Sequence, residues 1–111
     1  MRVLVAFDEA YRVYGETIAD AIRHSHPSPE AQAIDYAALE EVVHRWDPHL
    51  VICSPPVPHN PISTREAWVE LSLDTERPSR IRLGEQRWET LNPSLEELLS
   101  VVDEVEKLSE Q

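Results

Sequence analysis

Short apolar runs alternate with helix-period segments in the first half of the chain. Residues 3–7 and 50–53 are continuous apolar runs, which indicate strands buried on both faces. Residues 13–22 and 36–46 repeat apolar side chains every three or four positions, which predicts two amphipathic helices. A shorter apolar stretch at residues 31–34 predicts a strand between these helices. Strands that alternate with helices in this way predict a parallel sheet covered by helices.

The second half has a different pattern, because residues 67–91 alternate in polarity where a crossover helix would be expected. Apolar and polar side chains alternate in residues 69–73 and again in residues 80–83. A period of two indicates strands with one buried and one solvated face. Turn-forming residues at 77–79 and 84–85 separate these segments. The pattern therefore predicts a three-stranded meander.

The chain closes with a strongly amphipathic segment. Residues 95–108 place leucine and valine at helical spacing, with two glutamates in the first turn, where the helix dipole favours negative charge. Asn92 or Ser94 is expected to cap this helix, and Pro93 to lie near its start. At 111 residues the chain has room for one domain, which we assign to residues 1–111.

Charge and cysteine content narrow the range of partners. Ten Lys and Arg residues against 21 Asp and Glu residues give a formal net charge of −11. Nucleic acids and anionic membranes are therefore poor partners, because binding to either depends on neutralising phosphates. The start of the chain lacks a secretory signal pattern, and no apolar run approaches the length of a membrane span. With the single Cys53, these features predict a cytoplasmic protein.

Three segments resemble the receiver domains of bacterial response regulators. They are RVLVAFDE at residues 2–9, DPHLVICS at residues 47–54 and NPSLEEL at residues 92–98. The resemblance implies an α/β fold with a flavodoxin-like, doubly wound parallel sheet. In this chain the β-meander is expected to replace helices in the second half of that fold.

The phosphotransfer chemistry of receivers is not expected here. The family uses an acidic pair after the first strand for Mg²⁺, an aspartate after the third strand, a Thr or Ser after the fourth and a lysine after the fifth. In this chain those positions fall on Phe7 and Asp8 (with Glu9 beside them), Ser54, Ser72 and Asn92. A serine hydroxyl cannot replace a carboxylate as the acceptor of an acyl phosphate, and one or two carboxylates hold Mg²⁺ weakly. The resemblance therefore implies no aspartyl phosphorylation, and we expect no metal, cofactor or catalytic residue.

Aromatic and basic residues of the meander form a candidate interaction surface. Trp68 shares its parity with polar Glu70, so we expect it on the solvated face. Tryptophan and arginine are enriched at the centres of protein interfaces. The predicted surface lies within residues 62–91 and consists of Trp68, Arg80, Arg82, Arg87 and Trp88. Alternatively, the tryptophans pack beneath the proline-rich segment or against the last helix.

Two hypotheses for function follow. The favoured one is a phosphorylation-independent pseudo-receiver that acts as a regulatory protein-interaction or dimerisation module, with another protein or a second copy as partner. The alternative is a small-molecule-binding protein or minimal enzyme, with Asp8, Ser54 and His59 lining a pocket at the carboxyl edge of the sheet. Asp8 and Glu9 form a residual cation site there, or else they are a cap for the following helix or ordinary solvated acids.

Overall fold

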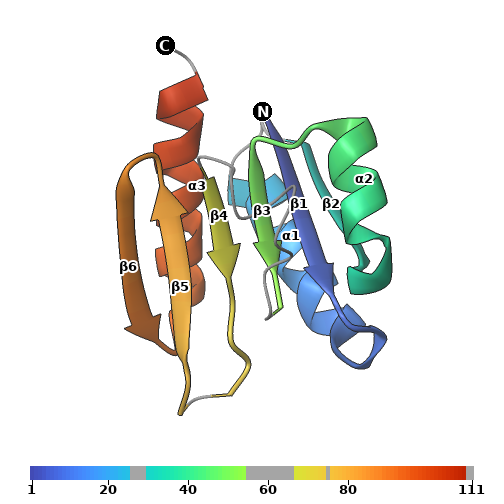
Figure 1. Ribbon diagram of the computed structural model, residues 1–111, viewed down its shortest axis with the longest axis horizontal. Coiled ribbons are helices and arrows are strands. Elements are labelled where there is room, and N and C mark those ends of the chain that lie inside the picture. The colour runs from blue at the N-terminus through green and yellow to red at the C-terminus, as the bar shows by residue number, and fades with distance from the viewer. Residues whose placement is uncertain (26–29, 55–66, 75, 110–111) are drawn as a thin grey trace.

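The computed structural model describes residues 1–25, 30–54, 67–74 and 76–109 (Figure 1). Within these residues the chain forms six strands, three α-helices and two short 3₁₀ turns at Glu9–Tyr11 and Tyr36–Ala38. The strands are β1 (Arg2–Phe7), β2 (Glu30–Asp35), β3 (Leu50–Cys53), β4 (Ala67–Glu70), β5 (Pro78–Leu83) and β6 (Gln86–Leu91). The helices are α1 (Arg12–Ser25), α2 (Leu39–Trp46) and α3 (Leu95–Ser109). None of the helices in the described part of the chain is long and apolar enough to cross a membrane.

The six strands form one mixed sheet in the order β2-β1-β3-β4-β5-β6. Strands β2, β1, β3 and β4 run parallel, whereas β5 and β6 follow β4 as an antiparallel meander. The predicted fold class, an α/β sheet with a meander in its second half, is confirmed. The physical basis is that continuous apolar runs fill the central parallel strands, while the period-two segments form the strands nearer one edge.

Helices cover both faces of the parallel half of the sheet. Helices α1 and α3 lie on one face (Figure 1), where Val5 and Ile52 pack against Ile18 and Val102. Helix α2 covers the other face and contributes Leu39, Val42 and Val43 to a second, smaller cluster. Alternate residues of β1 and β3 therefore enter different clusters, as expected for strands buried on both sides.

Trp68 and Glu70 are buried, so the prediction that their face of β4 is solvated is wrong. Trp68 is 8% exposed and belongs to the cluster beneath α2, and Glu70 is 7% exposed. The reason is the order of the strands. Since β4 pairs with β3, Trp68 lies beside Val51 and within reach of the apolar residues that α2 covers.

Helix α3 begins at its predicted residue and ends one residue later, and its buried face differs from the predicted one at three positions. The Ser94 hydroxyl accepts a hydrogen bond from the Glu97 N–H (3.2 Å), so Ser94 is the cap. Val101 is buried, whereas Leu95 and Leu108, at the two ends of the predicted apolar face, are exposed.

A two-residue turn joins β5 to β6. Leu83 and Gln86 are paired, which leaves Gly84 and Glu85 to reverse the chain. Gly84 has φ +61°, and a positive φ at the first central position is typical of the type II′ turns that suit the twist of a hairpin. The hairpin therefore has a defined register along its whole length.

Candidate functional site

The residues that the receiver resemblance assigned to the acidic pair have different environments. Phe7 is buried at the end of β1, with its ring edge-on to Tyr14 (centroids 5.7 Å apart). A Cβ at Gly15 would lie 3.0 Å from Phe7 Cδ2, so the glycine permits this close approach of α1. Asp8 and Glu9 are exposed, and the Asp8 carbonyl accepts the Tyr11 N–H (2.8 Å). Asp8 precedes the 3₁₀ turn, but its side chain makes no capping hydrogen bond.

Ser54 and Ser72 follow the ends of β3 and β4 at the carboxyl edge of the sheet. The Ser54 N–H donates to the Ala6 carbonyl (3.1 Å), which places Ser54 beside the end of β1. Ser54 is 6% exposed, and its hydroxyl makes no hydrogen bond in the described part of the chain. The Ser72 hydroxyl donates to the Asp74 carbonyl (3.2 Å), so it stabilises a local turn. The two hydroxyls are therefore in different environments.

Asn92 lies far from Ser54 along the same edge. Because β5 is antiparallel, the next strand that ends at this edge is β6, and Asn92 follows it with φ +46°. Strands β4 and β5 lie between β3 and β6, so the two residues are separated by three strand spacings, or roughly 14 Å. The positions carried over from the receiver family therefore do not form one cluster.

Buried polar groups gather on the face that α2 covers. Burial, followed by the charge of Glu70, raises the pKa of the Cys53 thiol to about 12. Burial also raises the pKa of Tyr36, with further contributions from Cys53 and Asp8. A neutral, fully buried thiol is a poor nucleophile, so Cys53 is a core residue.

Glu70 and Arg80 form an ion pair that sequence analysis missed. Both Glu70 carboxylate oxygens accept hydrogen bonds from the Arg80 guanidinium at 2.8 Å, and the guanidinium carbon lies 6.0 Å from the Trp68 ring centroid. The pair links β4 to β5, where the two residues are direct cross-strand neighbours. The available signal was the opposite charge of two residues with the same parity on consecutive strands of the meander.

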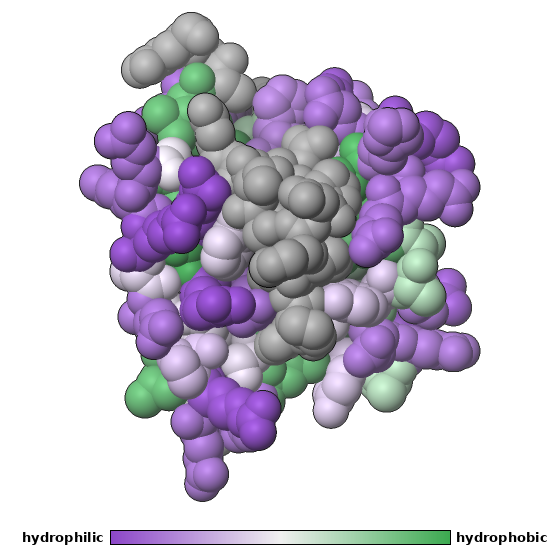
Figure 2. All heavy atoms as spheres, viewed as in Figure 1, coloured by the Kyte–Doolittle hydropathy of each residue, from purple (hydrophilic) through white to green (hydrophobic). Residues whose placement is uncertain are grey.

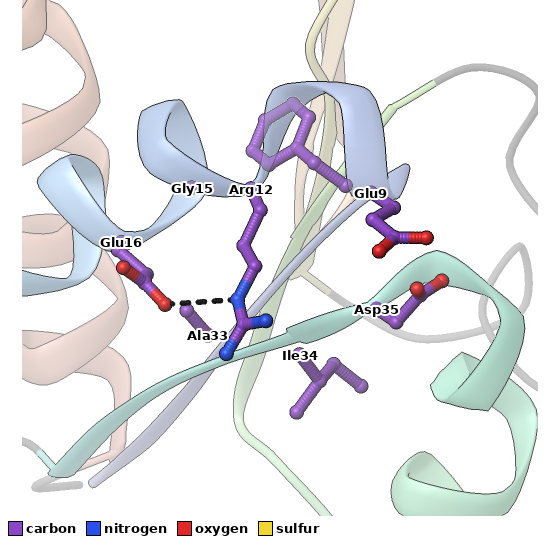
Figure 3. Close-up of a pocket in the computed structure, with 8 residues that line it drawn as sticks. Glu9, Arg12, Gly15, Glu16, Ala33, Ile34 and Asp35 are labelled. Atoms are coloured by element: carbon purple, nitrogen blue, oxygen red, sulfur yellow. Dashed lines mark hydrogen bonds and ion pairs between the residues drawn. The ribbon is translucent and has the colours of Figure 1, made fainter.

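A cavity of about 340 Å³ lies at the carboxyl ends of β1 and β2, beside the start of α1. Figure 3 shows the Arg12 side chain extending from α1 toward β2, with its Nε 3.2 Å from a Glu16 carboxylate oxygen. The cavity is lined by Phe7, Glu9, Arg12, Gly15, Glu16, Ala33, Ile34 and Asp35. Of the predicted residues, Phe7 and Glu9 line it, whereas Asp8 and Ser54 do not; the side chains from α1 and β2 were not predicted.

Some predicted residues lie outside the described part of the chain. His59 and residues 62–66 belong to this group, so the predicted cluster of Asp8, Ser54 and His59 is described only for its first two members. Among the residues described, no three His, Cys, Asp or Glu side chains are arranged to hold a metal ion.

The five residues of the predicted interaction surface do not share one face. Trp68 is buried, as described above. Arg80, Arg82 and Arg87 point to the face that α2 covers, because Arg82 pairs directly with Arg87 and both have the parity of Arg80. Trp88 pairs with Ile81 and therefore lies on the face of α3. On the side of the molecule seen in Figure 2, the described elements are mainly hydrophilic.

Trp88 borders an open groove between the β5–β6 hairpin and α3. The groove has a volume of about 210 Å³. Its apolar lining is formed by Ile81, Leu83, Trp88 and Val101, and its polar lining by Glu97, Ser100 and Glu104. The large apolar side chain of Trp88 is 39% exposed. Helix α3 therefore leaves part of strand β6 uncovered.

The architecture defines the class of the protein: an α/β domain with a mainly parallel sheet and an antiparallel extension. Comparisons with protein-family models, with curated proteins and with solved structures find no match to the chain.

Proposed function

We propose that the protein is a phosphorylation-independent, pseudo-receiver-like interaction module that binds a protein partner at the outer edge of β6. The observation that carries the proposal is the combination of an edge strand with no strand paired on its outer side in the described structure, and the half-exposed Trp88 on that strand. The function is binding rather than turnover.

An edge strand offers unpaired backbone donors and acceptors to another chain. Partners that add a strand gain main-chain hydrogen bonds, while pockets on either face of the sheet select their side chains. In β6, five of the six residues are exposed and the strand contains no proline. The groove beside Trp88 supplies an apolar contact next to this edge.

The arrangement at the carboxyl edge supports a function without phosphotransfer. By the resemblance to receivers, Ser54 corresponds to the phosphorylated aspartate and Asn92 to the lysine, and two strands lie between the strands that these residues follow. A hydroxyl at the acceptor position and a neutral amide at the lysine position supply neither the nucleophile nor the charge that phosphoryl transfer requires.

A photo-crosslinking amino acid at Gln86 tests the proposal in the cells that make this protein. Gln32 is the matched control, because both glutamines are exposed and lie on opposite edge strands of the same sheet. We expect a discrete crosslinked product from position 86 and none from position 32. Equal crosslinking from both positions, or none from position 86, would contradict the proposal. The mass of the product separates a second copy from a different protein.

The cavity between α1 and β2 supports small-molecule binding as a second candidate function. Its volume, about 340 Å³, lies in the range of small-molecule sites, and Arg12 offers a cation among several carboxylates. A thermal-shift screen of metals, nucleotides and metabolites tests this function, since binding to the native state raises stability. A ligand effect should disappear in Arg12→Ala and persist in Arg45→Ala, an exposed arginine on α2. The absence of any stabilising compound would count against this candidate.

A further inference from the structure

We infer that the partner at β6 is a second copy of this chain, paired antiparallel through a twofold axis at Trp88. The inference rests on the proposed function, since it names the occupant of the same edge. In this arrangement Arg87 lies opposite Glu89 of the second copy, and Glu89 lies opposite the second copy's Arg87. The result is one continuous sheet across both molecules.

The hairpin turn determines which backbone groups of β6 face outward. In a hairpin with a two-residue turn, the residues that close the turn form a hydrogen-bonded pair, here Leu83 and Gln86. Pairs then alternate, so residues 86, 88 and 90 direct their N–H and C=O groups toward β5. The outward groups belong to Arg87, Glu89 and Leu91.

These outward groups restrict the registers in which two copies can pair. Two copies of β6 can pair antiparallel about a twofold axis, so that one residue lies opposite the same residue of the second copy. If the pair uses the outward groups in the middle of the strand, this central residue is 87, 88 or 89. Centring on residue 87 places Arg87 opposite its own copy, and centring on residue 89 does the same for Glu89. Centring on Trp88 gives two Arg87–Glu89 pairs. Opposite charges across a pair stabilise a sheet and like charges destabilise it, so the register at Trp88 is favoured.

The charges on the hairpin itself support this register. Within one copy, Arg87 lies directly opposite Arg82, a like-charge pair. Arg87 makes no ion pair with a carboxylate in the described part of the chain. Arg80, in contrast, forms an ion pair with Glu70 and interacts electrostatically with Glu89 on the neighbouring strand. The second copy's Glu89 would supply the missing counter-charge to Arg87. Each Glu89 would then lie between Arg80 of its own chain and Arg87 of the partner copy.

The same register brings the two Trp88 side chains together on the opposite face. Residues at the centre of a non-hydrogen-bonded pair have Cα atoms about 4.5 Å apart, so their side chains are close neighbours. A twofold axis perpendicular to the sheet keeps both α3 helices on this face. The two grooves would meet at the tryptophans, so that the apolar area of each ring is covered by the other copy.

The opposite edge of the sheet is protected, which explains why the contact is assigned to β6. The Arg23 guanidinium donates two hydrogen bonds, of 2.9 and 2.7 Å, to the Ala31 carbonyl of β2. Since the Glu30 N–H donates to the Met1 carbonyl next to β1, the neighbouring residue Ala31 faces outward. A charged side chain on an outward carbonyl is one way in which proteins block an edge strand.

Sedimentation velocity of the full chain at micromolar concentrations tests the inference through charge exchange. We expect the unchanged chain to form a dimer, and Arg87→Glu and Glu89→Arg to raise its Kd at least about tenfold, because each converts two attractive pairs into repulsive ones. An equimolar mixture of the two variants should restore the dimer, since each copy then meets opposite charges. Thermal unfolding of each variant verifies that the hairpin remains folded, and Arg87→Glu should be folded because it faces Arg82.

The outcomes separate the register, the occupant and the proposed function. Two variants that remain monomeric when mixed would overturn the register at Trp88. Variants that dimerise as well as the unchanged chain would overturn the contact through Arg87 and Glu89 at β6. An unchanged chain that is monomeric throughout would overturn the second copy as occupant. In that last case, a product of different mass from position 86 and none from position 32 would leave the proposed interaction function standing.

Discussion

The Cys53 thiol should be almost unreactive in the native protein. Cys53 lies in β3 with no exposed surface, and burial together with the Glu70 carboxylate raises its pKa from 9.0 to about 12. The thiolate is the reactive form, so at pH 8 its fraction falls from about one in ten to about one in ten thousand. A thiol reagent should therefore label the native chain at least about 1000-fold more slowly than the urea-unfolded chain. Cys53 is the single cysteine, so all labelling reports on this site.

The raised pKa of Cys53 also makes the free energy of unfolding depend on pH. Between pH 9 and pH 12 the unfolded thiol loses its proton and the native thiol keeps it, so the free energy of unfolding falls as pH rises. The loss is about 1 kcal/mol by pH 10 and reaches about 4 kcal/mol by pH 12. Urea titrations at pH 8 and pH 10 measure it, with Cys53→Ala as the variant that lacks this contribution. Native labelling at pH 8 within tenfold of the unfolded rate would contradict the raised pKa of Cys53. An equal loss of stability in the unchanged chain and in Cys53→Ala would contradict it as well.

Two further substitutions test local parts of the structure by urea denaturation. Arg80→Ala should lower the free energy of unfolding by about 1–3 kcal/mol, because the buried Glu70 carboxylate loses two hydrogen bonds. Arg77→Ala is the control, because it removes an exposed ion pair between Arg77 and Asp74 (3.7 Å) and should lower the free energy of unfolding by less than about 0.5 kcal/mol. Similar losses in Arg80→Ala and Arg77→Ala would contradict the role of Glu70. Ser94→Ala should cost about 1 kcal/mol through the lost cap of α3. Ser100→Ala in the same helix should have little effect, and an equal loss would show that the cap is not responsible.

The elements that follow from the sequence are those whose burial leaves a periodic pattern. The run at residues 50–53 gives β3 with its predicted bounds, since a strand buried on both faces has no polar positions. The meander is equally readable, because Ile81 and Leu83 enter the core while Arg80 and Arg82 do not. These local patterns determine the type of each element.

The order of the strands in the sheet could not be predicted from the polarity pattern. Parity shows that Trp68 and Glu70 share a face, but it does not show whether a helix covers that face. The answer depends on β4 pairing with β3, next to the cluster beneath α2. The candidate site has the same dependence: Asn92 is separated from Ser54 because β4 and β5 lie between β3 and β6, and this strand order is not visible in the residues near either position.

The distribution of charge also bears on the proposed contact of the β5–β6 hairpin with a second copy. The chain has a net charge of −11, so two copies repel each other at long range. Residues 77–91 differ from the rest, with four arginines and two glutamates. At physiological ionic strength, charges further than about 8 Å from a contact are largely screened, so the repulsion at the hairpin comes mainly from its small excess of arginine rather than from the net charge of the whole chain. Two hairpins therefore repel each other less than two copies of the acidic helix α3 would, and the alternation of Arg87 and Glu89 then selects the register. A modest rise in salt should accordingly weaken this contact less than it would a contact held by ion pairs alone, because screening also reduces the repulsion between the two acidic bodies.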